Sequence, residues 1–163
     1  MNLELRTLTP DDWATWRSMR LAALADAPEA FGSRFEDWVD ADEDRWRARL
    51  SLPGAVDLLA YDTGTGEPVG MATGTPVADY DAGAELISMW VAPVARGRGV
   101  AALLIDAVAR WATNAGARAL VLSVMKDNEA ARRSYEKSGF VAVAETEAAG
   151  KADEREMVMR RKL

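Results

Sequence analysis

Apolar residues recur along this chain in two short-range patterns that predict β-strands. Leu3 and Leu5 alternate with polar neighbours, which is the two-residue period of a strand with one buried face. Residues 119–124 are almost uniformly apolar, as is typical of a strand covered on both faces. A Thr-Gly-Thr-Gly turn at residues 63–66 predicts a hairpin. Together the patterns predict strands at residues 2–7, 56–61, 68–75, 85–91, 119–124, 140–144 and 156–160.

Other segments space their apolar residues at helical intervals. In the first, Thr9 is placed to cap the helix, Pro10 suits its first position, and an apolar stripe follows. The segment 25–33, which contains a proline and a glycine, ends this helix. Further along, Asp106 and Arg110 are spaced for an i,i+4 ion pair. The spacing predicts helices at residues 10–24, 38–50, 99–113 and 128–137.

The order of these elements is strand, two helices, three strands, helix, strand, helix and two strands. A chain of 163 residues is the usual size of one domain, and no internal repeat divides it. Because a hairpin is followed by strands that alternate with helices, we expect a single domain of the α+β class with a mixed sheet over residues 1–163.

The composition then excludes several kinds of chemistry. The chain has neither histidine nor cysteine. Disulfides, thiolate nucleophiles, iron–sulfur clusters and the usual zinc sites are therefore excluded, and no metal site is predicted, although carboxylates alone can bind hard cations. The Ser-His and Cys-His nucleophile pairs are excluded as well. If the protein is an enzyme, its proton transfers must use Asp, Glu, Tyr, Lys or water.

The net charge of −6 disfavours binding to nucleic acids or to anionic membranes and favours cationic ligands. Residues 36–44 contribute six acids, a run more typical of a solvated face or a helix start than of a ligand site. The first residues lack the apolar run of a signal peptide, and no stretch is long and apolar enough to span a membrane. We therefore expect a cytoplasmic protein.

The strongest candidate for a binding site is the loop between the strand at 85–91 and the following helix. Gly97 and Gly99 allow the backbone to approach a ligand, and the helix that follows presents unpaired N–H groups. Arg96 and Arg98 add positive charge beside them, so phosphate is the natural ligand. A plain glycine turn with two exposed arginines is the structural alternative.

Three kinds of phosphate-binding loop are candidates for this stretch. A Walker loop is excluded because no Gly-Lys-Ser/Thr sequence follows. The spacing of Gly97, Gly99 and Ala102 fits the dinucleotide fingerprint G-x-G-x-x-G/A. That alternative, a small nucleotide-binding oxidoreductase, is disfavoured because the loop follows an antiparallel hairpin and too few strands remain after it.

The third possibility is a family resemblance carried by two motifs. Residues 96–101, Arg-Gly-Arg-Gly-Val-Ala, look like the Q/R-x-x-G-x-G/A pyrophosphate loop of the GNAT acetyltransferase superfamily. Residues 128–140 resemble its second motif, N-x-x-A-x-x-x-Y-x-x-x-G-F, through Asn128, Tyr135 and Gly139-Phe140. The motifs occur in the family's order, with room for one helix and one strand between them. The resemblance implies a central, mostly antiparallel twisted sheet of about six or seven strands, flanked by about four helices.

The resemblance also implies a function and a set of site residues. It implies an acetyl-CoA-dependent N-acetyltransferase that transfers the acetyl group directly to a primary amine. Tyr135 matches the family tyrosine that protonates the departing thiolate, while Asn128 matches the asparagine that contacts the cofactor. The strand end would bind the pantetheine arm and the loop the pyrophosphate. The implied acetyl-CoA-binding residues are Met89, Trp90, Val91, Arg96, Gly97, Arg98, Gly99, Val100, Ala101, Asn128 and Tyr135.

A base must also remove a proton from the amine, which is mostly protonated near neutral pH. Glu85, 11 positions before Arg96, stands where some members of the superfamily carry a glutamate base. A strand-edge carboxylate in solvent is the alternative for this residue, and a water chain is the alternative base. Other members carry a glutamate five positions before Asn128, but this chain has Ser123 there, which weakens assignment to the subgroup that acetylates ribosomal-protein N-termini.

The acceptor is left open by the sequence. In this architecture its pocket is shaped by the first two helices, the segment 25–33 and the loop 77–84, where Asp79 and Asp81 suit a cationic amine. Small molecules, peptides and protein side chains all fit these features. A non-catalytic acyl-CoA-binding module is the alternative function. The resemblance also suggests a homodimer.

Overall fold

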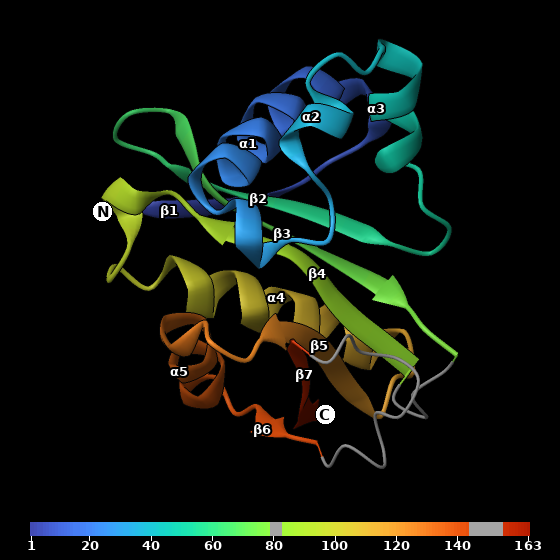
Figure 1. The fold of residues 1–163 in the computed structure, drawn as a ribbon, viewed down its shortest axis with the longest axis vertical. Helices are drawn as coiled ribbons and strands as arrows, with labels where there is room; N and C mark the ends of the chain where they lie inside the picture. The colour runs from blue at the N-terminus through green and yellow to red at the C-terminus, as the bar shows by residue number, and fades with distance from the viewer. Residues whose placement is uncertain (79–82, 144–154) are drawn as a thin grey trace.

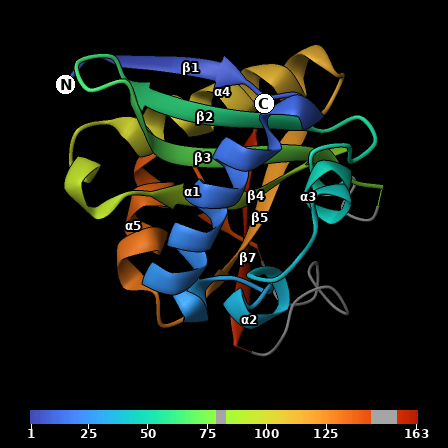
Figure 2. The same cartoon turned by 90° about the horizontal axis from the view of Figure 1, so that it is seen from above.

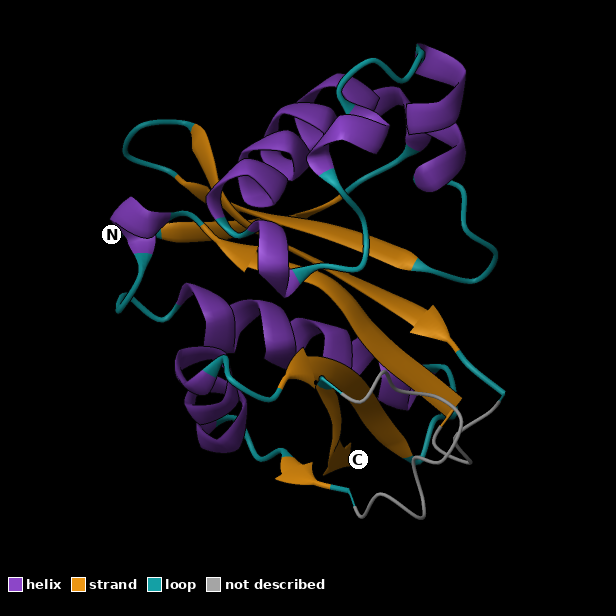
Figure 3. Ribbon diagram, viewed as in Figure 1, coloured by secondary structure: helices purple, strands orange, loops and turns teal. Residues whose placement is uncertain are grey.

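The computed structural model describes residues 1–78, 83–143 and 155–163, which build one seven-stranded sheet (Figures 1 and 3). β4 and β5 pair in parallel, and all other neighbouring strands of this sheet pair antiparallel. The order across the sheet is β1-β2-β3-β4-β5-β7-β6, and Figure 2 shows this order from β1 to β7. The strands are β1 (Leu3–Thr7), β2 (Val56–Asp62), β3 (Glu67–Pro76), β4 (Gly83–Val91), β5 (Ala119–Met125), β6 (Val141–Ala142) and β7 (Glu156–Lys162).

Helices cover both faces of the sheet (Figure 1). On one side lie α1 (Trp13–Asp26), α2 (Phe35–Trp38) and α3 (Glu43–Arg49), and on the other α4 (Val100–Asn114) and α5 (Glu129–Lys137). Each layer has its own apolar core. Trp16 and Trp46 pack edge to face on the α1 side, with ring centroids 5.8 Å apart. On the α4 side, Leu104 and Val108 are fully buried against the sheet.

The first helices differ in detail from the sequence prediction. The helix predicted at 38–50 starts later, as α3 at Glu43, and the separate short helix α2 ends at Trp38. The Asp42 carboxylate accepts a hydrogen bond of 2.9 Å from the Arg45 amide and so caps the start of α3. At the first helix, Thr9 forms the expected cap, but its capping box with Asp12 opens a 3₁₀ turn, and α1 begins only at Trp13. The acids near residue 42 thus act at a helix start.

Two irregularities of β4 create space for a site. The parallel pairing of β4 with β5 covers only Gly83–Glu85 against Ala119–Val121. Beyond it the two strands diverge (Figure 1). The β3–β4 register also shifts between Met71 and Thr73, opposite Ser88, whose φ of 52° is left-handed. A bulge here re-aims the rest of the strand toward the gap.

Candidate active site

A cavity of about 750 Å³ lies between the end of β4, the start of α4 and α5. Its wall also includes the end of α1 and the segment that follows it. All predicted acetyl-CoA-binding residues except Arg98 line it, namely Met89, Trp90, Val91, Arg96, Gly97, Gly99, Val100, Ala101, Asn128 and Tyr135. Arg98 is exposed and is not among the described lining residues. The fold therefore brings two distant sequence motifs to one cavity.

The start of α4 offers unpaired backbone donors to this cavity. Gly97 and Gly99 have φ of 76° and 83°, which glycine adopts without strain. Gly99 is the N-cap of α4 and supplies no side-chain cap, so the first amides of the helix have no partner within it. A Cβ built on either glycine meets nothing within 4 Å. Open backbone donors and the positive end of the helix dipole together suit a phosphate group.

Arg96 is held beside the loop by the end of α1. Its Nη2 donates to the Asp26 carboxylate at 2.7 Å, and its Nε donates to the Val91 carbonyl at 3.1 Å. The same Asp26 oxygen accepts from the Trp90 indole at 3.0 Å. The hydrogen bonds from Trp90 and Arg96 lower the pKa of Asp26, which keeps this carboxylate ionised. Asp26 thus links α1 to both β4 and the loop.

α5 supplies the opposite wall. Asn128 caps the helix, since its Oδ1 accepts from the Ala131 amide at 3.2 Å. About two helical turns after Asn128, the Tyr135 ring packs edge to face on Phe140, with ring centroids 5.8 Å apart. Burial raises the pKa of the Tyr135 phenol to about 12, so the phenol stays protonated over the physiological range and can donate a proton.

A buried polar network fixes the bulge in β4. Arg49 Nη2 donates to the hydroxyls of Ser88 and Thr73, each at 3.1 Å, and Nη1 donates to Asp57 at 3.1 Å. Thr73 in turn donates to Asp57 at 2.6 Å. Nothing in the sequence pattern singled out Arg49, because its partners come from three different strands.

The structure places Glu85 away from the cavity lining. Ala84 and Leu86 point into the core beneath α4, so Glu85 between them points to the opposite face of the sheet. Met89 in the cavity wall is four positions further along the strand, about 13 Å away. Burial, and secondarily the charge of Glu156, raise the pKa of Glu85. A raised pKa suits a base near neutral pH, but Glu85 does not line the described cavity and so does not contact an amine bound there directly.

Sequence reasoning missed several residues of the wall. Asp26 and Phe31 belong to the segment predicted to shape an acceptor pocket, yet neither was named as a site residue. Ser134, Lys137 and Ser138 on α5 were missed as well. The helical spacing from Tyr135 could have found Ser138, three positions after it, and Ser134 lies four positions before Ser138. None of the six acids at 36–44 lines the described cavity, and Asp79 and Asp81 lie outside the described residues.

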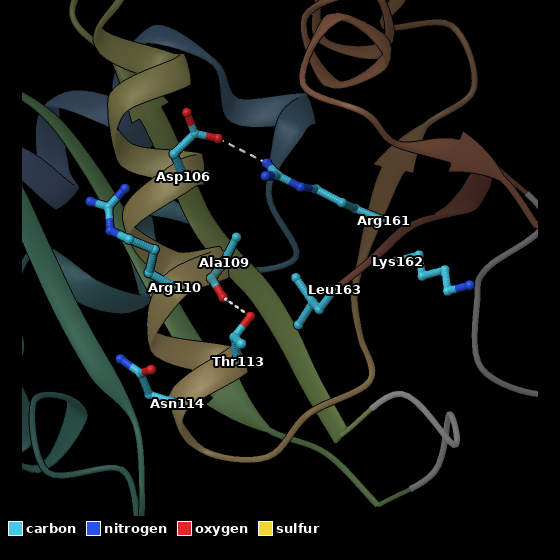
Figure 4. Close-up of a pocket in the computed structure, with 8 residues that line it drawn as sticks. All are labelled: Asp106, Ala109, Arg110, Thr113, Asn114, Arg161, Lys162 and Leu163. Carbon is cyan, nitrogen blue, oxygen red and sulfur yellow. Dashed lines mark hydrogen bonds and ion pairs between the residues drawn. The ribbon is translucent and has the colours of Figure 1, made fainter.

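A second, smaller hollow of about 440 Å³ lies at the other end of α4, beside β7 (Figure 4). The Asp106 carboxylate there accepts from Arg161 at 2.9 Å, in place of the partner expected from the sequence, Arg110. Figure 4 shows Arg110 on a different side of the helix. Because the Asp106 carboxylate already pairs with Arg161, it is not free to bind a cationic ligand in this hollow.

Comparison with known proteins decides the family. A model of the acetyltransferase (GNAT) family matches residues 16–140 of the chain. The chain belongs to the GNAT family. Two mycothiol acetyltransferases, from Renibacterium salmoninarum and Mycobacteroides abscessus, are 30% and 32% identical to this GNAT chain over 143 and 142 residues. The matches cover 85% and 87% of the chain but 40% and 46% of the relatives, so the chain spans less than half of their length.

Solved structures show the same fold. The PaiA N-acetyltransferase of Thermoplasma acidophilum, solved in complex with coenzyme A, matches the GNAT chain with a TM-score of 0.74 at 17% identity, over 100% of both chains. The GNAT fold expected from the two motifs is therefore confirmed. Among the described residues, no helix is long and apolar enough to cross a membrane.

Proposed function

We propose that this GNAT chain is an acetyl-CoA-dependent N-acetyltransferase that transfers the acetyl group directly to a primary amine. One observation carries the proposal: the open N-terminus of α4, with its two left-handed glycines, shares a cavity with the protonated Tyr135 phenol. A phosphate site and a proton donor in one cavity are what acyl transfer from a coenzyme A thioester requires. The coenzyme A in the PaiA structure supports the same choice of donor.

Each wall of the cavity has a role in this proposal. The loop with Gly97 and Gly99 and the first amides of α4 would bind the pyrophosphate of acetyl-CoA. The edge of β4 that faces β5 is unpaired beyond Glu85, and its backbone groups at Met89, Trp90 and Val91 would bind the pantetheine arm. Asn128, whose Oδ1 caps α5, would use its remaining amide group on the cofactor.

The transfer forms a C–N bond and breaks a C–S bond. The thiolate that leaves takes the proton of the Tyr135 hydroxyl, which is later restored from solvent. The amine must give up its own proton, and Glu85 would receive it through water because the carboxylate does not line the described cavity. Because no nucleophilic cysteine exists in the chain, transfer runs without a thiol-bound acyl-enzyme.

Release of free coenzyme A thiol provides the test. The full chain with acetyl-CoA is assayed over amino acids, polyamines, aminoglycosides and peptide N-termini, and at least one amine should release thiol in proportion to acetylated product. Native mass spectrometry with acetyl-CoA and NAD runs in parallel. Coenzyme A retention without turnover of any amine would support an acyl-CoA-binding module instead, and retention of NAD alone would overturn the proposal.

A further inference from the structure

A buried guanidinium on α1 takes no part in the site described so far. The Arg20 residue is 7% exposed, and its Nη1 has no hydrogen-bond partner in the structure. No ion pair joins Arg20 to any other described residue. Burial lowers the pKa of Arg20 to about 10, with the charge of Arg49 as a second cause, yet the group remains cationic at neutral pH. A buried, charged donor without an acceptor is costly unless something else binds it.

The neighbours of Arg20 share this shortage of acceptors. One turn earlier on the same helix, the Trp16 indole nitrogen is also buried without a hydrogen-bond partner. The Arg49 guanidinium lies over the Trp16 ring at 4.6 Å, but its own donors are engaged by Asp57, Thr73 and Ser88. Of the two arginines, only Arg49 pairs with a carboxylate among the described residues, so the charge of Arg20 is left uncompensated.

The cluster formed by Arg20, Trp16 and Arg49 adjoins the cavity wall. Phe31 lines the cavity, and the Arg20 guanidinium carbon lies 4.6 Å from the centre of its ring. The ring covers one face of the guanidinium, so an oxygen ligand would bind at its N–H edge. Neither Arg20 nor Trp16 lines the described cavity itself, and Phe31 stands between it and Arg20. Asp26, another wall residue, is six positions further along α1, about 9 Å of helix. Arg49 reaches Ser88, the neighbour of Met89 in the wall.

We propose that Arg20, with the Trp16 indole beside it, binds an oxyanion carried by the acceptor, so that the preferred acceptor is an amine bearing a carboxylate or a similar anionic group. The inference rests on the proposed acetyltransferase function and names its substrate class. A guanidinium matches a carboxylate through two parallel hydrogen bonds, and the indole adds a third donor. The uncompensated charge of the cluster is then neutralised by the substrate. A polyamine would instead bring further positive charge to a cation.

Matched pairs of amines test the proposal on the unmodified protein. Leucine is compared with leucinamide and β-alanine with β-alaninamide, with aminomethylphosphonate as a phosphonate arm and putrescine as a cationic arm. We expect kcat/KM at least about 10-fold higher for the anionic member of a pair, the gain typical of one charge-assisted contact. Equal or better use of the amides or of putrescine would overturn the inference while leaving the acetyltransferase intact. Turnover of no amine in any arm would instead overturn the proposed function.

Substitution of Arg20 separates binding from a structural role. Arg20→Met should remove the preference for the carboxylate within each pair and leave turnover of the amide within about 3-fold, because only the anion contact is lost. Arg17→Met, a change of the same kind on the same helix, should keep the preference. Equal loss on both members of a pair would mean that Arg20 serves stability alone.

A binding measurement covers the case in which Arg20→Met fails to fold or no amine is turned over. The unmodified protein is melted with N-acetylleucine and with N-acetylleucinamide in the presence of coenzyme A. We expect the carboxylate to raise the Tm and the amide to raise it less, by mass action on the folded state. No difference between the two ligands would overturn the anion site.

Discussion

The Arg49 guanidinium donates a hydrogen bond of 3.1 Å to the hydroxyl of Ser88, joining the end of α3 to the bulge in β4. Ser88 is the one described residue other than glycine with a left-handed φ, at 52°. Such a backbone costs about 1–3 kcal/mol and persists only where its surroundings hold it. α3 thus maintains the bend that turns Met89 toward the cavity.

Removing this link should destabilise the fold strongly. Arg49→Met leaves Asp57, which is 4% exposed, without its cation, and a broken buried pair costs about 3–5 kcal/mol in the free energy of unfolding. Urea denaturation measures the loss. Arg47→Met serves as the control, because Arg47 pairs at the surface with Asp11 and Glu43 and should cost less than about 1 kcal/mol. Similar losses in both variants would contradict the role given to Arg49.

The two glycines at the ends of α4 offer a matched test of the phosphate site. Gly99 precedes the helix and Gly116 follows it, with φ of 83° and 88° and no neighbour within 4 Å of an added Cβ. Substituting either by alanine should cost the same backbone strain, about 1–2 kcal/mol. Only Gly99→Ala should also weaken acetyl-CoA binding in calorimetric titration, because its Cβ enters the space of the phosphate. Equal affinity in both variants would argue against a pyrophosphate at this loop.

Tyr135→Phe keeps the ring that packs on Phe140 and removes the proton donor. We predict that kcat falls about 100-fold or more, the usual contribution of a general acid, while the Kd of acetyl-CoA changes little. Thiol release gives kcat and calorimetry gives Kd. If kcat were unchanged, Tyr135 would have no catalytic role.

From the raised pKa of Glu85 we predict the pH dependence of both activity and stability. If Glu85 is the base, kcat/KM of the wild type rises with pH through a limb above 4.5, the ordinary pKa of this group, and Glu85→Gln removes that limb. The stability of the fold changes with pH in the opposite direction. A raised pKa in the folded state means that stability is lost as pH rises through it, so Glu85→Gln should gain stability at neutral pH relative to wild type.

Thermal denaturation from pH 4 to pH 8 measures the stability effect, and steady-state rates over the same range measure the limb. A limb that survives in Glu85→Gln would assign the proton to water or to another group. A variant less stable than wild type at neutral pH would contradict the buried setting of this carboxylate.

Local patterns were sufficient to predict most of the fold, because strands and helices here follow their hydrophobic periods. The start of α3 at Glu43 was missed, since a run of acids indicates a helix start without saying which acid becomes the cap, and only packing selects Asp42. The Asp106 prediction failed for a related reason. Helical spacing names Arg110, but β7 brings Arg161 to the same carboxylate from 55 residues away.

The residues of the site likewise fall into those that local patterns predict and those that they do not. Two local motifs predicted the loop and α5, because the phosphate contacts and the cap are made within short segments. Arg20, Asp26 and Arg49 could not be found from such patterns, since each acts on residues of other elements. Their significance depends on burial and on which acceptors are missing, and neither property is visible in sequence spacing.

One titration decides whether this cavity binds acetyl-CoA. Backbone amide NMR spectra of the wild-type protein are recorded as acetyl-CoA is added, with NAD in a parallel series. The expected result is saturable shifts at the amides of Met89, Val91, Gly97, Gly99 and Ala101, with none of that size from NAD. Unchanged amides at the loop and at the end of β4 in a folded protein, or the same shifts from NAD, would contradict the acetyltransferase assignment.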